Sequence, residues 1–231
     1  MSLKQNYDER KKEVNDYFDF LRRVEQLDDP NPIRVSPEQQ KILFSNVYIL
    51  LYNLIESTIV GCCKELEHGL SHHKVSDILQ FNFELRNQWI KTTSRISANE
   101  KKRLSGIYNL FEKLTNTTTS LELIFRMKKG GNLDDMKISE LLKEFGIVLD
   151  LPKPLHTEVC KHRLDGKGIL QAIRHIRNQL AHGEKSFIEC GSNIGLLDLN
   201  DYAKIVFLYL EHVIGRIENY IVNKEYMTVT P

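Results

Sequence analysis

The feature that most constrains the fold of this chain is a long apolar pattern with helical spacing, which runs from Ile42 to Leu66. Ser36 and Pro37 stand shortly before it, as a helix N-cap and a first-turn proline do. Because a helix of this length and apolarity must be covered by other elements, the pattern predicts a largely buried helix at the centre of a core.

The longest continuous apolar stretch is too short to cross a bilayer, since Tyr52 and Asn53 interrupt it and Glu56 ends it. The first ten residues, MSLKQNYDER, lack the apolar core of a signal peptide. The cysteines show no CxxC spacing. We therefore expect a cytoplasmic protein with reduced thiols at Cys62, Cys63, Cys160 and Cys190.

Helical patterns also account for most of the remaining chain, and they predict an all-α bundle that forms a single domain over residues 1–231. Asp134 or Asp135 can cap a short helix that ends near Phe145. Residues 186–190 are an exception, because they can form a short strand or one arm of a hairpin. The other predicted helices cover residues 7–27, 74–94, 98–114, 164–181 and 199–222.

Charge is balanced over the whole chain but concentrated in one segment. The 32 basic and 31 acidic residues give a formal net charge of +1, which argues against binding of nucleic acid through bulk positive charge. Between residues 161 and 185, however, six basic residues stand against two acidic ones, a local charge of +4. We expect any contact with nucleic acid there, through Lys161, Arg163, Lys167, Arg174, Arg177 and Lys185.

The same segment contains the sequence RNQLAH, in which four residues separate Arg177 from His182. Asn178 lies four positions before His182, so these two side chains share a helix face. Arg177 lies about 140° around an ideal helix from His182. The two residues can converge if the last helical turn frays, if the long arginine bends around the helix, or if a second subunit supplies one of them.

The R-N-x-x-A-H sequence at a helix end resembles the Arg-x4–6-His motif of the HEPN superfamily, particularly of members associated with bacterial conflict, toxin–antitoxin and restriction loci. The surroundings are similar too, with an early long helix, the basic segment, and a long final helix. The likeness covers residues 36–223, and the N-terminal helix and linker of residues 1–35 lie outside it.

This resemblance implies a metal-independent endoribonuclease with no cofactor, which cuts RNA by attack of the 2′-hydroxyl on the adjacent phosphate. His182 is expected to act as general base or acid, because an imidazole titrates near working pH and a helix C-terminus favours its protonated form. Arg177 is expected to hold the phosphate and stabilise its developing charge. Asn178 would orient His182 or contact the phosphate.

The resemblance also implies a homodimer, with paired motif helices facing each other across an RNA-binding groove. Such a protein acts as a toxin or anti-phage defence effector, and an antitoxin or another protein is expected to neutralise it. The groove would be lined by basic residues that bind RNA phosphates, namely Arg163, Lys167, Arg174 and Lys185.

Other interpretations stay open. The chain can be a non-catalytic HEPN module that binds RNA, nucleotide or a protein partner, or a purely structural dimerisation domain. An arginine and a histidine near a helix end are often only a solvated side chain and a C-terminal cap. A metal site that joins cysteines to nearby histidines matches no standard zinc spacing, although its candidates lie close in the sequence, at Cys62, Cys63, His68, His72 and His73.

Overall fold

The computed structural model describes residues 3–25, 33–70, 72–94, 100–115, 132–163 and 166–228. Within these ranges every regular element is a helix, and Phe81 and Met227 form an isolated antiparallel bridge. The predicted all-α class is therefore confirmed. The chain divides into two compact units, and the prediction of a single domain stays a prediction.

The first unit is built around the early part of the long helix predicted from the sequence. It comprises Met1–Val60, Asn132–Lys137 and Asp150–Ile214. Its helices, two of which continue beyond it, are α1 (Leu3–Val24), α2 (Pro37–Leu70), α6 (Lys153–Cys160), α7 (Ile169–His182), α8 (Phe187–Gly191) and α9 (Leu196–Val222).

Helix α2 supplies the centre of this unit's core, with Val47, Leu51 and Leu54 at most 1% exposed. Among the described helices, α2 alone has the length and apolar composition of a helix that crosses a membrane. However, 56% of its most apolar 18-residue window is buried inside the structure. This burial is consistent with the core helix of a soluble protein.

Helix α1 packs against both α2 and α9. The Tyr17 hydroxyl donates a hydrogen bond to the carbonyl of Leu43 in α2, at 2.9 Å. The Lys11 ammonium forms an ion pair with Glu211 in α9, at 2.6 Å. Since Phe18 on the apolar stripe of α1 is also buried, the helix is an integral part of the first unit.

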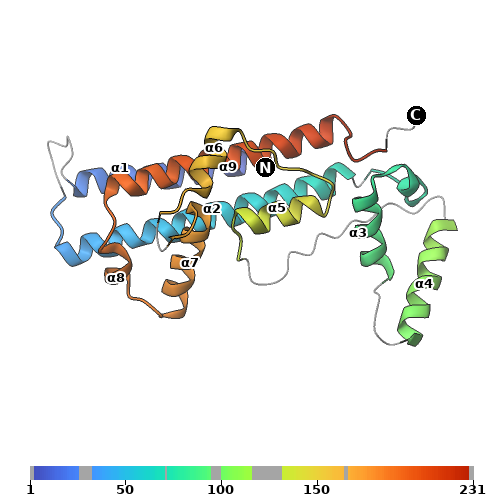
Figure 1. Cartoon of the computed structure of the whole chain (residues 1–231), viewed down its shortest axis with the longest axis horizontal. Helices are drawn as coiled ribbons and strands as arrows, with labels where there is room; N and C mark the ends of the chain where they lie inside the picture. The colour runs from blue at the N-terminus through green and yellow to red at the C-terminus, as the bar shows by residue number, and fades with distance from the viewer. Residues whose placement is uncertain are drawn as a thin grey trace. The chain divides into compact units, whose positions relative to one another are not determined.

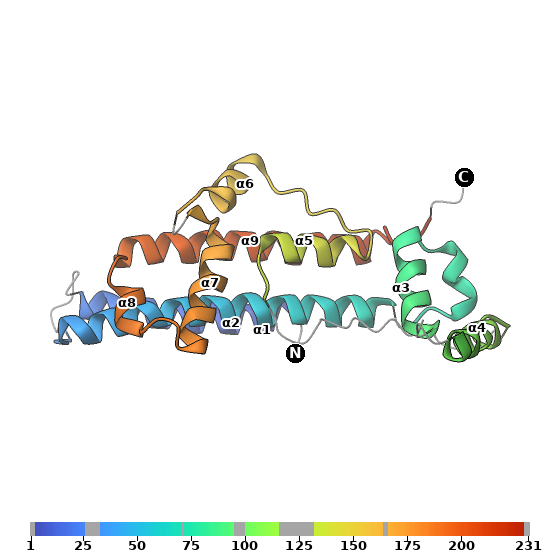
Figure 2. The same cartoon turned by 60° about the horizontal axis from the view of Figure 1, so that its bottom comes forward.

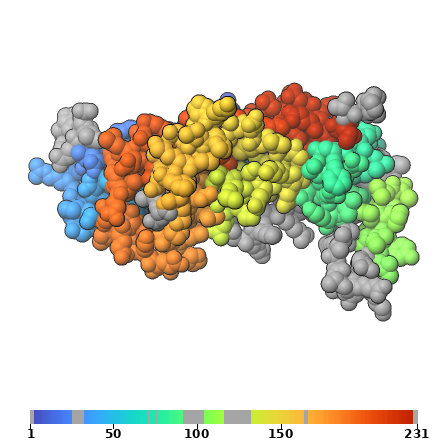
Figure 3. Space-filling model, in the orientation of Figure 1, coloured from blue at the N-terminus to red at the C-terminus, as the bar shows by residue number. Residues whose placement is uncertain are grey.

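Helix α7 runs crosswise to α2 and α9, as Figures 1 and 2 show in orange. Its apolar side chains enter the core, and Ile169, Leu170 and Ile173 are fully buried. Helices α6, α7 and α8 all reach the face of the molecule seen in Figure 3. This arrangement buries one side of α7 and leaves the other available for polar contacts.

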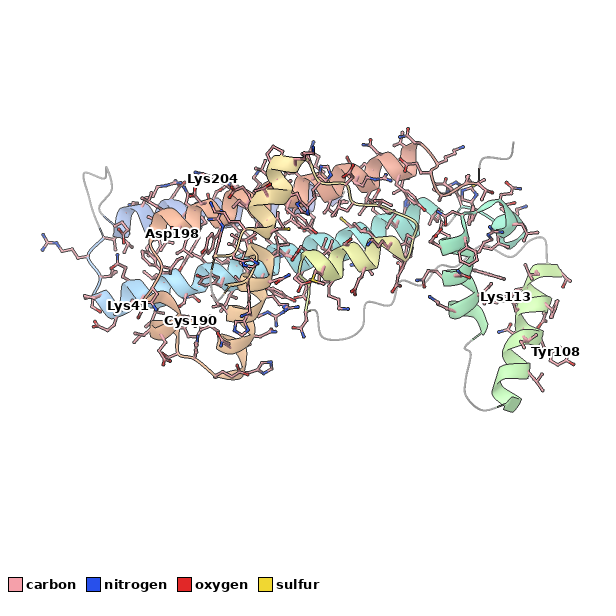
Figure 4. The ribbon with its side chains drawn as sticks, viewed as in Figure 1. Lys41, Tyr108, Lys113, Cys190, Asp198 and Lys204 are labelled. Atoms are coloured by element: carbon pink, nitrogen blue, oxygen red, sulfur yellow. The ribbon has the colours of Figure 1, made fainter. Side chains whose placement is uncertain are left out.

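The second unit comprises Gly61–Gly131, Ile138–Leu149 and Gly215–Pro231. It holds the ends of α2, α9 and α5 (Asp135–Lys143), together with the 3-10 helix η1 (Val75–Gln80), α3 (Phe83–Ser94) and α4 (Glu100–Thr115). Helix α4 exposes an apolar stripe, and Tyr108 on it is 75% exposed (Figure 4). The other members of this stripe are Leu104, Ile107 and Phe111.

Two predictions about the helices are wrong. Residues 186–190 do not form a strand, because a capping box opens helix α8 there. The Ser186 hydroxyl accepts a hydrogen bond from the Glu189 N–H, and the Glu189 carboxylate accepts one from the Ser186 N–H. The helix predicted over residues 74–94 is interrupted before α3, because Phe81 pairs with Met227 and the Asn82 N–H bonds to the carbonyl of Tyr226. The second error reflects partners remote in the sequence.

The short helix before the predicted site begins and ends as predicted. The Asp134 carboxylate accepts from the Lys137 N–H at 2.8 Å and caps α5. Gly146 follows the helix with a φ of 77°, a left-handed conformation that suits glycine. A Cβ there would also lie 2.6 Å from the Asn82 side-chain nitrogen, so a larger residue would have to displace that amide.

Candidate functional site

The predicted site lies on the second half of α7, a strongly amphipathic helix. Gly183 ends the helix with a φ of 70°, as predicted, and its N–H bonds to the carbonyls of Gln179 and Leu180. His182 is therefore the last residue of the helix. Along the polar side of α7, intervals of three or four residues place four side chains in one line, namely Gln171, Arg174, Asn178 and His182.

Arg177 lies outside this line and is half-buried against Tyr52 of α2. Its guanidinium carbon is 3.5 Å from the centre of the Tyr52 ring. The Tyr52 hydroxyl accepts a hydrogen bond from the Leu133 N–H at 3.3 Å. Burial raises the pKa of Tyr52, while this hydrogen bond and the Arg177 charge act in the opposite direction. The arginine thus occupies a defined place on an aromatic face.

The side chains of this polar line on α7 form a hydrogen bond and an ion pair with the chain segment just before α5. Asn178 donates a hydrogen bond to the Asn132 side-chain oxygen at 2.8 Å. Four residues earlier, Arg174 forms an ion pair with Asp134 at 2.5 Å. The Asp134 side chain is only 5% exposed, so this pair is largely shielded from water.

Asp135 extends the same row of contacts by one further turn of α7. Its carboxylate accepts a hydrogen bond from the Gln171 side chain. Burial raises the pKa of Asp135, and the adjacent negative charge of Asp134 adds to this, although the bond from Gln171 acts in the opposite direction. Residues 132–135, which we call the anchoring segment, therefore run antiparallel to α7.

His182 has different surroundings, because its side chain is exposed. Among the residues that the structure describes, none forms a hydrogen bond or an ion pair with its ring. Within one chain, Arg177 is directed onto Tyr52 while His182 faces solvent. The structure places Asn178 one turn from His182 on the same face and leaves the arginine on another.

The four residues predicted to bind RNA phosphates are divided between the two ends of α7 and its middle. Arg163 precedes the helix, forms an ion pair with Glu158 at 2.5 Å, and lies over the Tyr202 ring. Lys167 also precedes the helix and is half-buried. Arg174 is paired within the fold as described above. Only Lys185, which is exposed, follows His182 closely.

A metal site near the cysteines is not supported. Cys62 and Cys63 are 1% and 7% exposed and lie in the core as small apolar residues. His68 and His72 are exposed. Among the described residues, no three histidine, cysteine, aspartate or glutamate side chains are grouped so that they could hold a metal ion.

Sequence reasoning missed Tyr52 and Asn132 as partners of the motif residues. Tyr52 counted only as an interruption of the apolar stretch, although a tyrosine in the middle of a buried helix usually brings a hydrogen-bonding or ring contact with it. Asn132 carried no signal at all, because its role depends on where the anchoring segment lies in space.

The chain as a whole matches a family described as HEPN_MAE_28990-like HEPN, over residues 1–226. The match also includes residues 1–35, to which the resemblance of the motif and its surroundings did not extend. No curated protein and no solved structure matches the chain significantly. Because the family match spans nearly the whole chain and the described fold is all-α, the protein belongs to this HEPN family.

Proposed function

We propose that this HEPN protein is a metal-independent endoribonuclease that uses Arg177, Asn178 and His182. The observation that supports this proposal best is the exposed His182 at the end of α7, one turn after an asparagine and five positions after an arginine held on an aromatic ring. An exposed imidazole can reach a ribose hydroxyl, and a fixed guanidinium can stabilise a phosphate that gains charge.

The reaction needs little beyond these groups, because RNA contains its own nucleophile. His182 accepts the proton of a 2′-hydroxyl while its oxygen attacks the adjacent phosphorus. The bond from phosphorus to the 5′-oxygen breaks, and a protonated group gives that oxygen a proton. The products are a 2′,3′-cyclic phosphate and a 5′-hydroxyl.

A homodimer explains how the site is completed. Within one chain Arg177 and His182 lie about 140° apart around α7, so a single phosphate is reached more easily by groups from two copies. A second copy also supplies a second histidine, which can serve as the acid for the leaving oxygen. Ile188 in α8 and Leu197 in α9, which are 37% and 76% exposed, offer apolar surface for such an association.

The biological setting follows from the resemblance alone. We propose a cytoplasmic toxin or anti-phage effector that cuts RNA and is held inactive by an antitoxin or another protein. Lys185 is the basic residue best placed to hold RNA beside His182, since it is exposed and follows the helix end.

A non-catalytic HEPN module is the second candidate, and one observation favours it. Arg163 and Arg174 are already in ion pairs with Glu158 and Asp134. The positive charge free to attract RNA is therefore smaller than the sequence count of the segment suggests. Such a module would bind RNA, a nucleotide or a protein and leave RNA ends intact.

The test is incubation of purified wild type, His182→Ala, Arg177→Ala and His72→Ala with total RNA in EDTA, followed by analysis of product ends. His72 is an exposed histidine of the second unit and serves as the matched control. We expect cleavage to cyclic phosphates by wild type and control, and a loss of at least about 100-fold in the other two variants.

Equal cleavage by all four proteins would place the activity elsewhere. Retention of RNA with intact ends would favour the binding module.

A further inference from the structure

The Arg177 guanidinium rests on a side chain that is itself held in place. Tyr52 is 1% exposed, and the guanidinium carbon lies 3.5 Å from its ring centre, which is direct contact. The ring cannot shift freely, because the Tyr52 hydroxyl accepts a hydrogen bond from the Leu133 backbone. The arginine therefore lies on a fixed platform.

Stacking of this kind suits a residue that must bind phosphate. A free arginine side chain has many rotamers, and fixing one of them in the transition state costs free energy. The ring contacts the face of the guanidinium, whereas the N–H donors that recognise phosphate lie in the guanidinium plane. Stacking on the tyrosine ring thus limits the motion of the guanidinium, and a side-chain hydrogen bond between Arg177 and Tyr52 limits it further.

The same tyrosine is connected to a second motif residue. Leu133, which binds the Tyr52 hydroxyl, lies in the anchoring segment next to Asn132. Asn132 in turn accepts the hydrogen bond from Asn178. Tyr52 is therefore placed to hold Arg177 directly and to help fix the segment that holds Asn178.

We propose that Tyr52 is a positioning residue, which acts on RNA cleavage through Arg177 by holding its guanidinium ready for the phosphate. The inference rests on the proposed function. It names a residue outside the Arg-x4-His sequence, on a different helix, that the reaction requires.

The contact itself can be measured whether or not the protein cleaves RNA. The Nε–H proton of Arg177, identified by its loss in Arg177→Lys, is expected to show a ring-current shift in the NMR spectrum. The shift should disappear in Tyr52→Leu and remain in Tyr52→Phe, which keeps the ring. Tyr48→Leu, a change one turn earlier on α2 at an equally buried tyrosine, should leave it in place.

Cleavage kinetics then test the consequence of this contact. Tyr52→Leu should lower the cleavage rate about tenfold, Tyr52→Phe should recover most of it, and Tyr48→Leu should stay within about twofold of wild type. In an Arg177→Lys background, Tyr52→Leu should add less than about a twofold loss, because the residue through which it acts is already changed.

An equal loss from Tyr52→Leu in both backgrounds, or an unchanged Arg177 signal, would overturn the inference. If the wild type leaves RNA intact, the proposed function fails, and the NMR signal still decides whether Tyr52 holds Arg177.

Discussion

The polar side of α7 differs along its length. Up to Asn178 its side chains are bound to the anchoring segment, through an ion pair and hydrogen bonds. One turn later His182 is exposed, and the helix stops at a glycine. The helix is thus anchored through most of its length and free at its end.

We expect this contrast to separate two roles of the motif helix, which are stability in the anchored part and reactivity at the free end. In the anchored part, the Asp134 carboxylate that pairs with Arg174 is only 5% exposed, so a change at this pair should alter the free energy of unfolding. The exposed end contributes little to packing, so changes there should alter reactivity and leave stability nearly unchanged. The expected effects of substitutions follow this division.

The largest expected effect is at the free end. His182→Ala should lower RNA cleavage by a factor of about 100 to 10,000, since it removes the proposed general acid–base group. Its free energy of unfolding in urea should stay within about 0.5 kcal/mol of wild type. A marked loss of stability would show that His182 belongs to the anchored part, and the contrast would not hold.

In the anchored part, Asp134→Ala should lower the free energy of unfolding by about 3 kcal/mol. It leaves Arg174 without its shielded partner and removes the N-cap of α5. Urea denaturation followed by circular dichroism gives the value. The control is Asp201→Ala, which breaks a pair with Lys204 (Figure 4) whose side chains are 60% and 64% exposed. That change should lower stability by less than about 1 kcal/mol.

The region that follows the free end is also fixed to the core, at Gly191. A Cβ there would lie 2.0 Å from the carbonyl oxygen of Lys41, where α8 meets α2; Figure 4 labels Lys41 and the neighbouring Cys190. Gly191→Ala should therefore destabilise the protein by about 1–3 kcal/mol in thermal unfolding. Gly215→Ala, where a Cβ meets nothing within 4 Å in the middle of α9, should stabilise it by about 0.5–1 kcal/mol.

A smaller effect is expected at the glycine that ends α7. Gly183→Ala should lower stability by about 1 kcal/mol, because its φ of 70° strains an alanine although no atom blocks the Cβ. Gly183→Asn should be milder, since asparagine tolerates the left-handed region. If the alanine variant is as stable as wild type, the helix end has moved, and the position of His182 with it.

The smallest effect concerns pH. The folded-state pKa of Asp135 is raised, mainly by burial, so the folded protein keeps a proton that the unfolded chain has already released. Its contribution to stability is present below the ordinary aspartate pKa and is lost as pH rises through the raised value. In Asp135→Asn the contribution of this carboxyl to the pH dependence of stability should disappear. The urea midpoints of the variant, measured between pH 3 and pH 7, should therefore decline less with rising pH than those of wild type. Midpoints that change in parallel in the two proteins would contradict this assignment.

Some structure was predictable because its causes are local. The cap at Asp134, the stop at Gly183 and the central helix around Leu51 all depend on residues within a few positions of each other. The same is true of α8, where Ser186 and Glu189 form a capping box that the sequence displays, so the predicted strand was an avoidable error. The break before α3 was not avoidable, since it depends on Tyr226 and Met227 at the far end of the chain.

By itself, then, the sequence determined the all-α class, the family-like motif and the exposed helix end, because helical periodicity and capping act over a few residues. Only the tertiary structure decided what each motif residue contacts. Arg177 could have faced His182 or solvent, yet it lies on Tyr52, and Arg174 is paired with Asp134. Tyr52 comes from α2 and Asp134 from the anchoring segment, and the packing of the core, which no local pattern encodes, brings them to α7.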